Sequence, residues 1–205
     1  MLPFPPVARP IALPQGGGLT LWERWLSAAE EAALFDALTH ALPFRQDPIR
    51  LFGREVLQPR LVAWVGDPDA VYTYSGLTLA PLPWPPLLAA LRPRVEEAAG
   101  ATFNAVLVNW YRDGADSMGL HADDEPELGP DPVVASLSLG APRRFVLEPK
   151  RKAARSDRVA LTLPGGSLLV MHAGTQAAHR HGVPKQAHAE ARLNLTFRRV
   201  VHPGS

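Results

Sequence analysis

The stretch VVASLSLGAPRRFVL, residues 133–147, decides the expected fold, because it holds two short runs of β-branched, leucine and aromatic residues with turn residues between them. Runs of the same kind recur at 102–111, 159–163, 167–171 and 192–201. Such runs, bounded by Gly and Pro, are typical of β-strands. Their close spacing predicts a β-sandwich or β-barrel rather than alternating βα units.

Two helices are expected before position 100. The first begins after a capping box formed by Ser27 and Glu30 and ends before Pro43. The second begins near the proline pair 85–86, which suits a first turn, and ends at Gly100. The chain therefore divides into an N-terminal part with helices and a C-terminal part rich in strands.

The composition is that of an ordinary globular protein. With 205 residues, 46% hydrophobic and 20% charged, the chain fits one domain with a sizeable core. It has no cysteine, which excludes disulfides, thiolate metal sites and cysteine nucleophiles. Any metal must be held by His, Asp or Glu.

Neither a membrane span nor a secretory signal is expected. The longest uncharged segment, 70–91, is interrupted by four prolines, and the first eighteen residues are too rich in proline for a signal peptide. We therefore expect a cytoplasmic protein with a loose N-terminal arm.

The net charge of +1 hides an uneven distribution. Residues 113–131 hold seven acids and no Lys or Arg, whereas residues 141–205 hold twelve Lys and Arg against three acids. The first segment could attract cations and the second phosphates, although both patterns also fit a solvated surface. The basic run Lys150-Arg151-Lys152, continued by Arg155 and Arg158, is expected to be a loop that grips phosphates, or merely a soluble hairpin loop.

A candidate metal site begins at His121 and Asp123. These residues are two apart, so in an extended backbone they lie on the same side and can share one metal. Two histidines and one carboxylate leave positions open for a co-substrate and oxygen. Position alone does not choose the third ligand among the later histidines, which are His172, His179, His181 and His188.

The segment RLNLTFR, residues 192–198, is expected to be a strand with two arginines on its polar face. Arg192, Asn194, Thr196 and Arg198 alternate with Leu193, Leu195 and Phe197. Buried arginines need acidic partners. A bound dicarboxylate or acids of the protein itself would meet that need.

These motifs together resemble the AlkB family of Fe(II)- and 2-oxoglutarate-dependent dioxygenases. The resemblance covers roughly residues 51–200 and rests on Asn109-x-Tyr111, His121-x-Asp123, HGVPK at 181–185 and the strand at 192–198. Three stretches, 72–77, 102–125 and 134–141, look most like the members that repair duplex DNA. The resemblance implies an α+β fold with a double-stranded β-helix (jelly-roll) core and N-terminal helices packed on one side.

The resemblance also implies a domain organisation and a ligand set. Residues 1–20 would be a flexible Pro-rich arm, 21–100 a helical and nucleotide-recognition region, and 101–205 the jelly-roll catalytic core, all in one structural domain. His121, Asp123 and His181 would bind Fe(II), although His179 stands two positions earlier and could replace His181. The residues implied for 2-oxoglutarate are Asn109, Tyr111, Arg192, Asn194, Thr196 and Arg198.

The implied reaction is oxidative removal of alkyl groups from bases such as 1-methyladenine and 3-methylcytosine, with oxygen and 2-oxoglutarate converted to succinate, carbon dioxide and an aldehyde. Such an enzyme must extract its base from the stack. Leu51-Phe52-Gly53 would be a hydrophobic finger that fills the gap, unless Leu51 and Phe52 are ordinary core or surface residues. The other residues implied for substrate binding are Tyr72, Tyr74, Ser75, Asp124 and Glu125.

The expected partner is alkylated DNA, double-stranded, with RNA as the alternative, and the protein is expected to be a monomer without a membrane partner. Two other functions remain open. The same chemistry could act on RNA, protein or lipid, or the chain could be a non-catalytic binding module.

Overall fold

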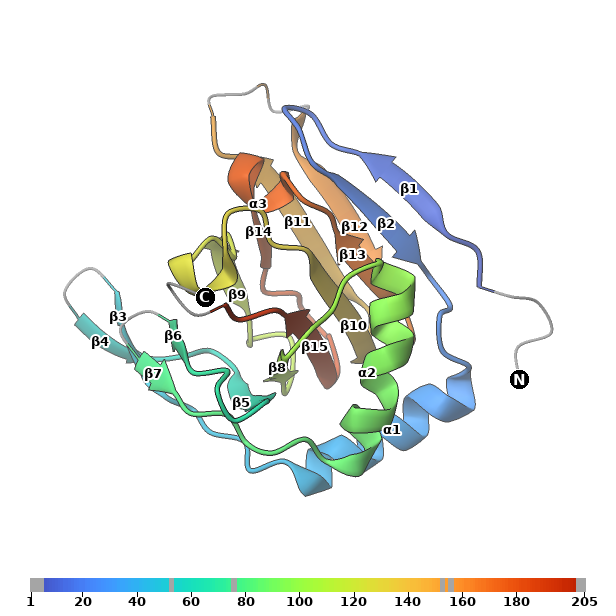
Figure 1. Ribbon diagram of the computed structural model, residues 1–205, viewed down its shortest axis with the longest axis vertical. Helices are drawn as coiled ribbons and strands as arrows, with labels where there is room; N and C mark the ends of the chain where they lie inside the picture. Colours follow the sequence, from blue (N-terminus) through green and yellow to red (C-terminus); the bar gives the residue numbers. More distant parts are fainter. Residues whose placement is uncertain (1–5, 52–53, 75–76, 152–153, 155–156, 202–205) are drawn as a thin grey trace.

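The computed structural model describes residues 6–51, 54–74, 77–151, 154 and 157–201. Its centre is a large antiparallel sheet that faces a smaller one (Figure 1). The large sheet has the strand order β1 (Arg9–Ala12), β2 (Gly18–Trp22), β13 (Leu168–Met171), β10 (Val134–Gly140), β15 (Arg192–Arg198), β8 (Ala105–Tyr111) and β5 (Leu61–Gly66). The small sheet has the order β12 (Val159–Leu163), β11 (Arg143–Pro149), β14 (His179–Val183) and β9 (Met118–His121).

The alternation of side chains along the strands gives the large sheet two buried faces. In β13, Leu168 and Val170 belong to one hydrophobic cluster, whereas Leu169 and Met171 belong to another. The second cluster also contains Phe145 of the small sheet, so it lies between the two sheets. The expected jelly-roll core is confirmed.

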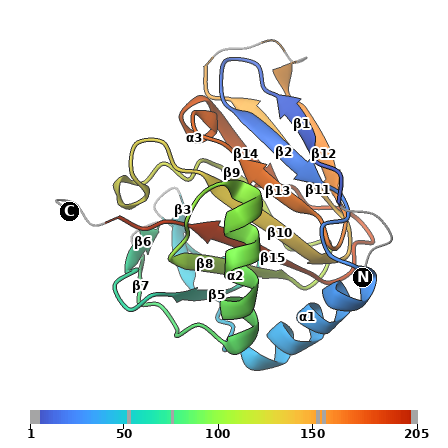
Figure 2. The same ribbon diagram turned by 45° about the vertical axis from the view of Figure 1, so that its right-hand side comes forward.

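Two helices cover the other face of the large sheet (Figure 2). Helix α1 (Ala28–Ala41) starts at the predicted capping box of Ser27 and Glu30. Helix α2 (Pro86–Ala99) buries Leu88, Leu91 and Val95 against the sheet. Each such side chain contributes about 1.5–3 kcal/mol of burial free energy. The expected α+β class, with its helices on one side, is also confirmed.

The N-terminal segment differs from the loose arm that the sequence predicts. From Arg9 onward it forms β1 and β2, and β2 pairs with β13 along the register Leu21–Leu169. Leu19 and Leu21 are buried in the core between the sheets. Hydrophobic burial and pairing with β13 therefore hold this segment in place despite its prolines. The division at positions 20 and 100 otherwise stays a prediction.

Two hairpins lie beside β5, at the lower left of Figure 1. They are β3 (Pro48–Leu51) with β4 (Arg54–Leu57), and β6 (Tyr72–Tyr74) with β7 (Leu77–Leu79). Of the predicted substrate residues, Phe52, Gly53 and Ser75 lie outside the described residues. Two further short helices are η1 (Pro126–Leu128) and α3 (Thr175–Ala178). No described helix is long and apolar enough to cross a membrane.

Candidate metal and co-substrate site

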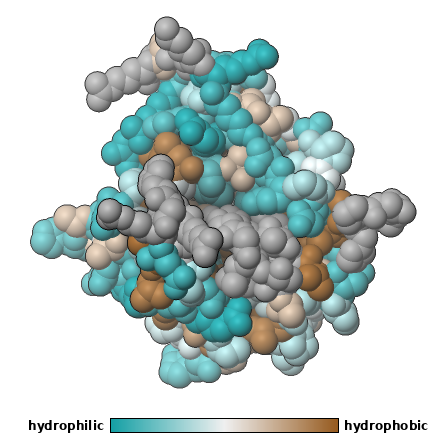
Figure 3. Space-filling view, turned by 90° about the vertical axis from the view of Figure 1, so that its left-hand side faces the viewer, coloured by the Kyte–Doolittle hydropathy of each residue, from teal (hydrophilic) through white to brown (hydrophobic). Residues whose placement is uncertain are grey.

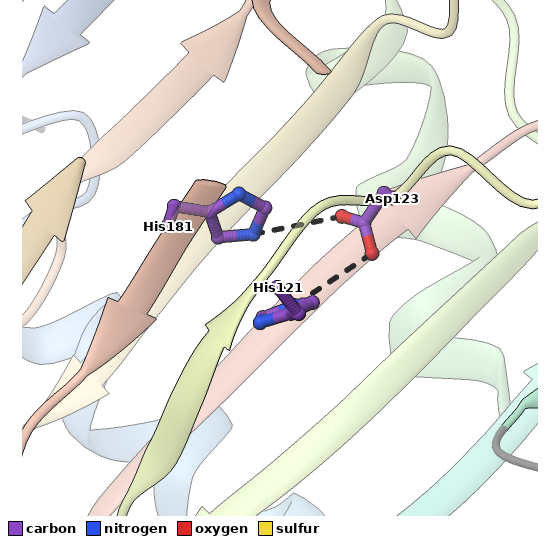
Figure 4. A group of neighbouring side chains, drawn as sticks. All are labelled: His121, Asp123 and His181. Atoms are coloured by element: carbon purple, nitrogen blue, oxygen red, sulfur yellow. Dashed lines mark ion pairs between the residues drawn. The ribbon is translucent and has the colours of Figure 1, made fainter. Parts of the chain in front are cut away.

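The register between β9 and β14 brings two of the predicted ligands together. His121 and His181 are paired across these antiparallel strands, and their ring centroids are 4.4 Å apart. Asp123 follows β9 and turns its carboxylate toward both rings (Figure 4). Its two oxygens lie 3.8 Å from Nε2 of His121 and 3.8 Å from Nε2 of His181. One candidate ligand atom from each residue lies within 4.8 Å of the other two, as three donors to one ion would.

The hydrogen bonds around the triad of His121, Asp123 and His181 leave ligand atoms available to bind a cation. Nδ1 of His121 lies 3.0 Å from the carbonyl oxygen of Gly119 and must donate to it, which leaves the lone pair on Nε2 free. Arg198 donates from Nη2 to Oδ1 of Asp123 at 2.7 Å. The other carboxylate oxygen, Oδ2, is buried without a hydrogen-bond partner among the described residues. A metal ion would satisfy that atom.

The electrostatics give the three groups their metal-binding protonation states. Burial lowers the pKa of His121 and lowers that of His181 to about 3, despite the opposing effect of Asp123. Burial alone would raise the pKa of Asp123, but Arg198 and the two histidines outweigh it and hold this pKa at about 2. At neutral pH the site therefore offers two neutral imidazoles and one carboxylate, the facial set typical of non-haem Fe(II). These residues fit Fe(II).

A pocket next to the triad lies between the two sheets. Asn109, Asn194, Thr196 and Arg198 line it from the large sheet, and His121 and His181 from the small one. The predicted polar face of β15 is therefore turned inward. Asn194 stands opposite Asn109, and Arg192 stands opposite Tyr111, in the pairing of β15 with β8.

Arg192 carries a buried positive charge beside this pocket. Its guanidinium lies 5.3 Å from the ring centre of Tyr111 and donates from Nη2 to Ser138 at 3.0 Å. Its Nε and Nη1 have no hydrogen-bond partner in the part of the chain that the structure describes. Burial lowers the pKa of Arg192 to about 10, with an opposing effect of Tyr111, so the group remains charged at neutral pH. An incoming carboxylate would pair with it, which fits 2-oxoglutarate.

This geometry agrees with the comparison to known families. A model described as the 2OG-Fe(II) oxygenase superfamily matches residues 18–198. The chain belongs to the 2OG-Fe(II) oxygenase superfamily. The match covers the triad, the pocket and every strand of the two sheets except β1, so Fe(II) and 2-oxoglutarate are the ligands that these residues are suited to hold.

Within this superfamily the chain is similar to proteins of the AlkB group. Alpha-ketoglutarate-dependent dioxygenase alkB homolog 3 of Rattus norvegicus is 42% identical over 191 residues, covering 88% of this chain and 63% of the relative. DNA oxidative demethylase ALKBH2 of Homo sapiens is 45% identical over 159 residues, covering 75% of this chain and 61% of the relative. The chain thus spans a little under two thirds of the length of these relatives.

A plant relative matches a larger share of the chain. DNA oxidative demethylase ALKBH2 of Arabidopsis thaliana is 36% identical over an alignment of 221 positions, which covers 96% of this chain and 70% of that protein. A solved structure titled OsALKBH1 shares the fold, with a TM-score of 0.64 at 19% identity over 90% of this chain and 97% of that one. The resemblance to the AlkB family is therefore confirmed.

Of the four candidate histidines of this AlkB-type oxygenase, the register brings His181 next to His121. The metal-ligand group among the described residues contains His181. His179 is buried at the start of β14, with no hydrogen-bond partner for either ring nitrogen among the described residues. His172 lies within hydrogen-bond distance of Thr20, and His188 is exposed.

The acidic residues next to the triad are engaged differently from one another. Asp124 is exposed and pairs with Lys150 at 2.6 Å, which links the acidic segment to the basic loop. Glu125 is partly buried and precedes η1.

The surface on the side of the two hairpins is largely hydrophilic where it is described (Figure 3).

Several residues near the site carry no clear signal in the sequence. Ser136 lines the pocket and accepts a hydrogen bond from Asn194, and its alternation with Leu137 is the sign that could have marked it. Arg60 is buried and donates to Asn109 at 2.7 Å. Arg143 is fully buried 5.3 Å from the Tyr111 ring centre. Neither arginine stands in a pattern that distinguishes it from surface arginines.

Proposed function

We propose that this protein is an Fe(II)- and 2-oxoglutarate-dependent dioxygenase that removes N-alkyl groups from damaged bases of nucleic acid. DNA is the proposed main substrate, and 1-methyladenine and 3-methylcytosine are the proposed lesions. The observation that carries the proposal is the His121-Asp123-His181 group, in which Asp123 and His181 are buried and His121 is half-buried. Arg198 lines the adjoining pocket, and the buried Arg192 contacts Tyr111, which also lines it. The names of the relatives, an alkB homolog 3 and a DNA oxidative demethylase, support the substrate class.

Each residue of the site has a proposed role in binding the metal or 2-oxoglutarate. His121, Asp123 and His181 would hold Fe(II), which with bound 2-oxoglutarate supplies the activation of oxygen. Arg192 would pair with the distal carboxylate of 2-oxoglutarate, while Asn194 and Arg198 lie toward the metal end of the pocket. Arg198 also fixes one oxygen of Asp123 by donating to it.

The acids that follow Asp123 in the sequence suit the proposed lesions. Methylation of adenine at N1 or of cytosine at N3 gives a cationic base, and Asp124 and Glu125 follow directly after the ligand Asp123. A carboxylate there would attract a cationic base, and Asp124, which pairs with Lys150, would exchange this partner for the base. Leu51-Phe52-Gly53 is the proposed finger that fills the gap left by a flipped base, and it makes duplex DNA the preferred form.

The test is removal of methyl from an oligonucleotide with one 3-methylcytosine, as single-stranded DNA, duplex DNA and RNA, with Fe(II) and 2-oxoglutarate added. Asp123→Ala should abolish repair, whereas Asp36→Ala, an exposed acid on α1, serves as the matched control and should retain it. Turnover of 2-oxoglutarate without repair of any oligonucleotide would refute the nucleic-acid substrate. Repair that persists in Asp123→Ala would refute the metal assignment.

A further inference from the structure

We propose that Gln176 is a positioning residue for the metal ligand Asp123. Gln176 lies on α3, just before β14, and the residue is 1% exposed. Its Oε1 accepts a hydrogen bond from the backbone N–H of Asp123 at 3.1 Å. The inference rests on the metal site of the proposed function and not on the nucleic-acid substrate.

The bond to Gln176 meets a specific need of the backbone. Strand β9 ends at His121, so the N–H of Asp123 lies beyond the ladder between β9 and β14. A buried N–H without a partner costs about 1–3 kcal/mol. Because an N–H can only donate, the amide of Gln176 must present its oxygen to it, which fixes the orientation of this side chain. Its Nε2 then lies 3.5 Å from Sδ of Met171, which lines the pocket.

Helix α3 is itself held firmly. Oγ1 of Thr175 donates to the carbonyl oxygen of Gly18 at 3.0 Å and accepts from its N–H at 3.1 Å. The N–H of Lys150 donates to the carbonyl oxygen of Ala178 at 2.8 Å. These contacts tie α3 to β2 and to the end of β11. Gln176 therefore reaches Asp123 from a fixed element.

Helix α3 connects two of the three candidate metal ligands, Asp123 and His181. The chain leaves α3 directly into β14, which carries His181, while Gln176 reaches across to Asp123. One short segment thus sets the distance between a histidine ligand and the carboxylate ligand. Loss of the bond would free the backbone at Asp123, and Arg198 would remain as the described side chain that holds its carboxylate. Residues that orient metal ligands typically contribute about 10- to 100-fold to metal affinity.

The experiment measures Co(II) binding to the metal-free protein, because Co(II) accepts nitrogen and oxygen ligands and its visible absorption reports their geometry. Gln176→Leu removes the acceptor at similar volume and should weaken Co(II) binding about 10- to 100-fold with an altered absorption spectrum. Gln176→Asn, which keeps the amide but is one carbon shorter, should weaken binding in the same way and replaces the leucine variant if that variant fails to fold.

The matched control is Asn104→Leu, which removes another amide that accepts a backbone N–H, that of Val200 at 2.7 Å, away from α3 and the triad. It should lower the melting temperature while Co(II) affinity stays within about threefold of the wild type. An unchanged Co(II) affinity in both Gln176 variants, or an equal loss in Asn104→Leu, would overturn the positioning role. Wild-type protein that binds Co(II) but repairs no oligonucleotide would refute the proposed function and leave this inference intact. Wild-type protein that binds no Co(II) would overturn both.

Discussion

Replacing Arg192 with methionine should have opposite effects on two quantities, the stability of the metal-free protein and its affinity for 2-oxoglutarate. Arg192 is 1% exposed, and two of the three nitrogens of its guanidinium have no hydrogen-bond partner among the described residues. Removing a buried charge that is poorly paired is neutral or stabilising, by up to about 4 kcal/mol. We therefore expect the metal-free Arg192→Met protein to melt at the same temperature as the wild type or higher.

The same substitution should damage the binding of 2-oxoglutarate. Loss of one partner of a buried, hydrogen-bonded charge pair costs about 2–5 kcal/mol, or about 30- to 4,000-fold in affinity. Calorimetric titration of the Co(II)-loaded protein with 2-oxoglutarate measures this loss, and thermal unfolding of the metal-free protein measures the stability.

Arg143→Met is the control, because it should lower the melting temperature, whereas Arg192→Met should not. Arg143 is as deeply buried, but its Nη1 and Nη2 donate to the backbone carbonyl oxygens of Asp113, Asp116 and Pro184. Its loss leaves these acceptors unpaired, which costs about 1–3 kcal/mol each and should lower the melting temperature. If Arg192→Met keeps its affinity for 2-oxoglutarate within threefold of the wild type, or melts as low as Arg143→Met, the assignment of Arg192 is wrong.

Three further predictions test other parts of the molecule. Burial alone would raise the pKa of Asp116, but hydrogen bonds from Arg112 hold it below its ordinary value of 3.8. The ion pair therefore stabilises the fold fully above about pH 4, and this stabilisation is lost as the pH falls through the lower pKa of the folded state. Asp116→Asn should therefore lower the melting temperature at pH 7, and a gap that does not narrow below pH 4 would contradict this. Gly17 has a φ of +75°, and a Cβ there would lie 2.6 Å from Thr175, so Gly17→Ala should destabilise the fold by about 1–3 kcal/mol in chemical denaturation. Phe52→Ala should reduce repair of duplex DNA at least tenfold while single-stranded repair changes little; equal losses on both would remove the finger from the proposal.

The strands and the faces of their side chains could be predicted from the sequence because both depend on local patterns. The alternation in residues 192–198 places Asn194 and Arg198 on the inner face, and the pocket contains both. The third metal ligand could not be chosen in this way. It depends on the pairing of His181 with His121 across strands that are sixty residues apart in the sequence, and such a register is not a property of either strand alone.

Neighbouring arginines show the same limit on a smaller scale. Arg143 and Arg144 are adjacent and chemically identical, yet Arg143 is buried and Arg144 is exposed, because the pleat of β11 turns them to opposite faces. The strands β1 and β2 escaped prediction for a different reason. Prolines and glycines disguise the pattern of residues 9–22, and the pairing with β13 that stabilises them is not visible locally.

The two unsatisfied groups near the site explain why both ligands are expected to stabilise the fold. Oδ2 of Asp123 is a buried acceptor suited to a cation, and Nε and Nη1 of Arg192 are buried donors suited to an anion. Each of these atoms is costly to bury without a partner, and a ligand of opposite charge would offset that cost. Because a ligand that binds only the folded state stabilises it in proportion to the logarithm of its concentration, a metal ion and 2-oxoglutarate should each raise the melting temperature. The pair should act more strongly together than the sum of the two, since the bound cation attracts the anion into the adjoining pocket.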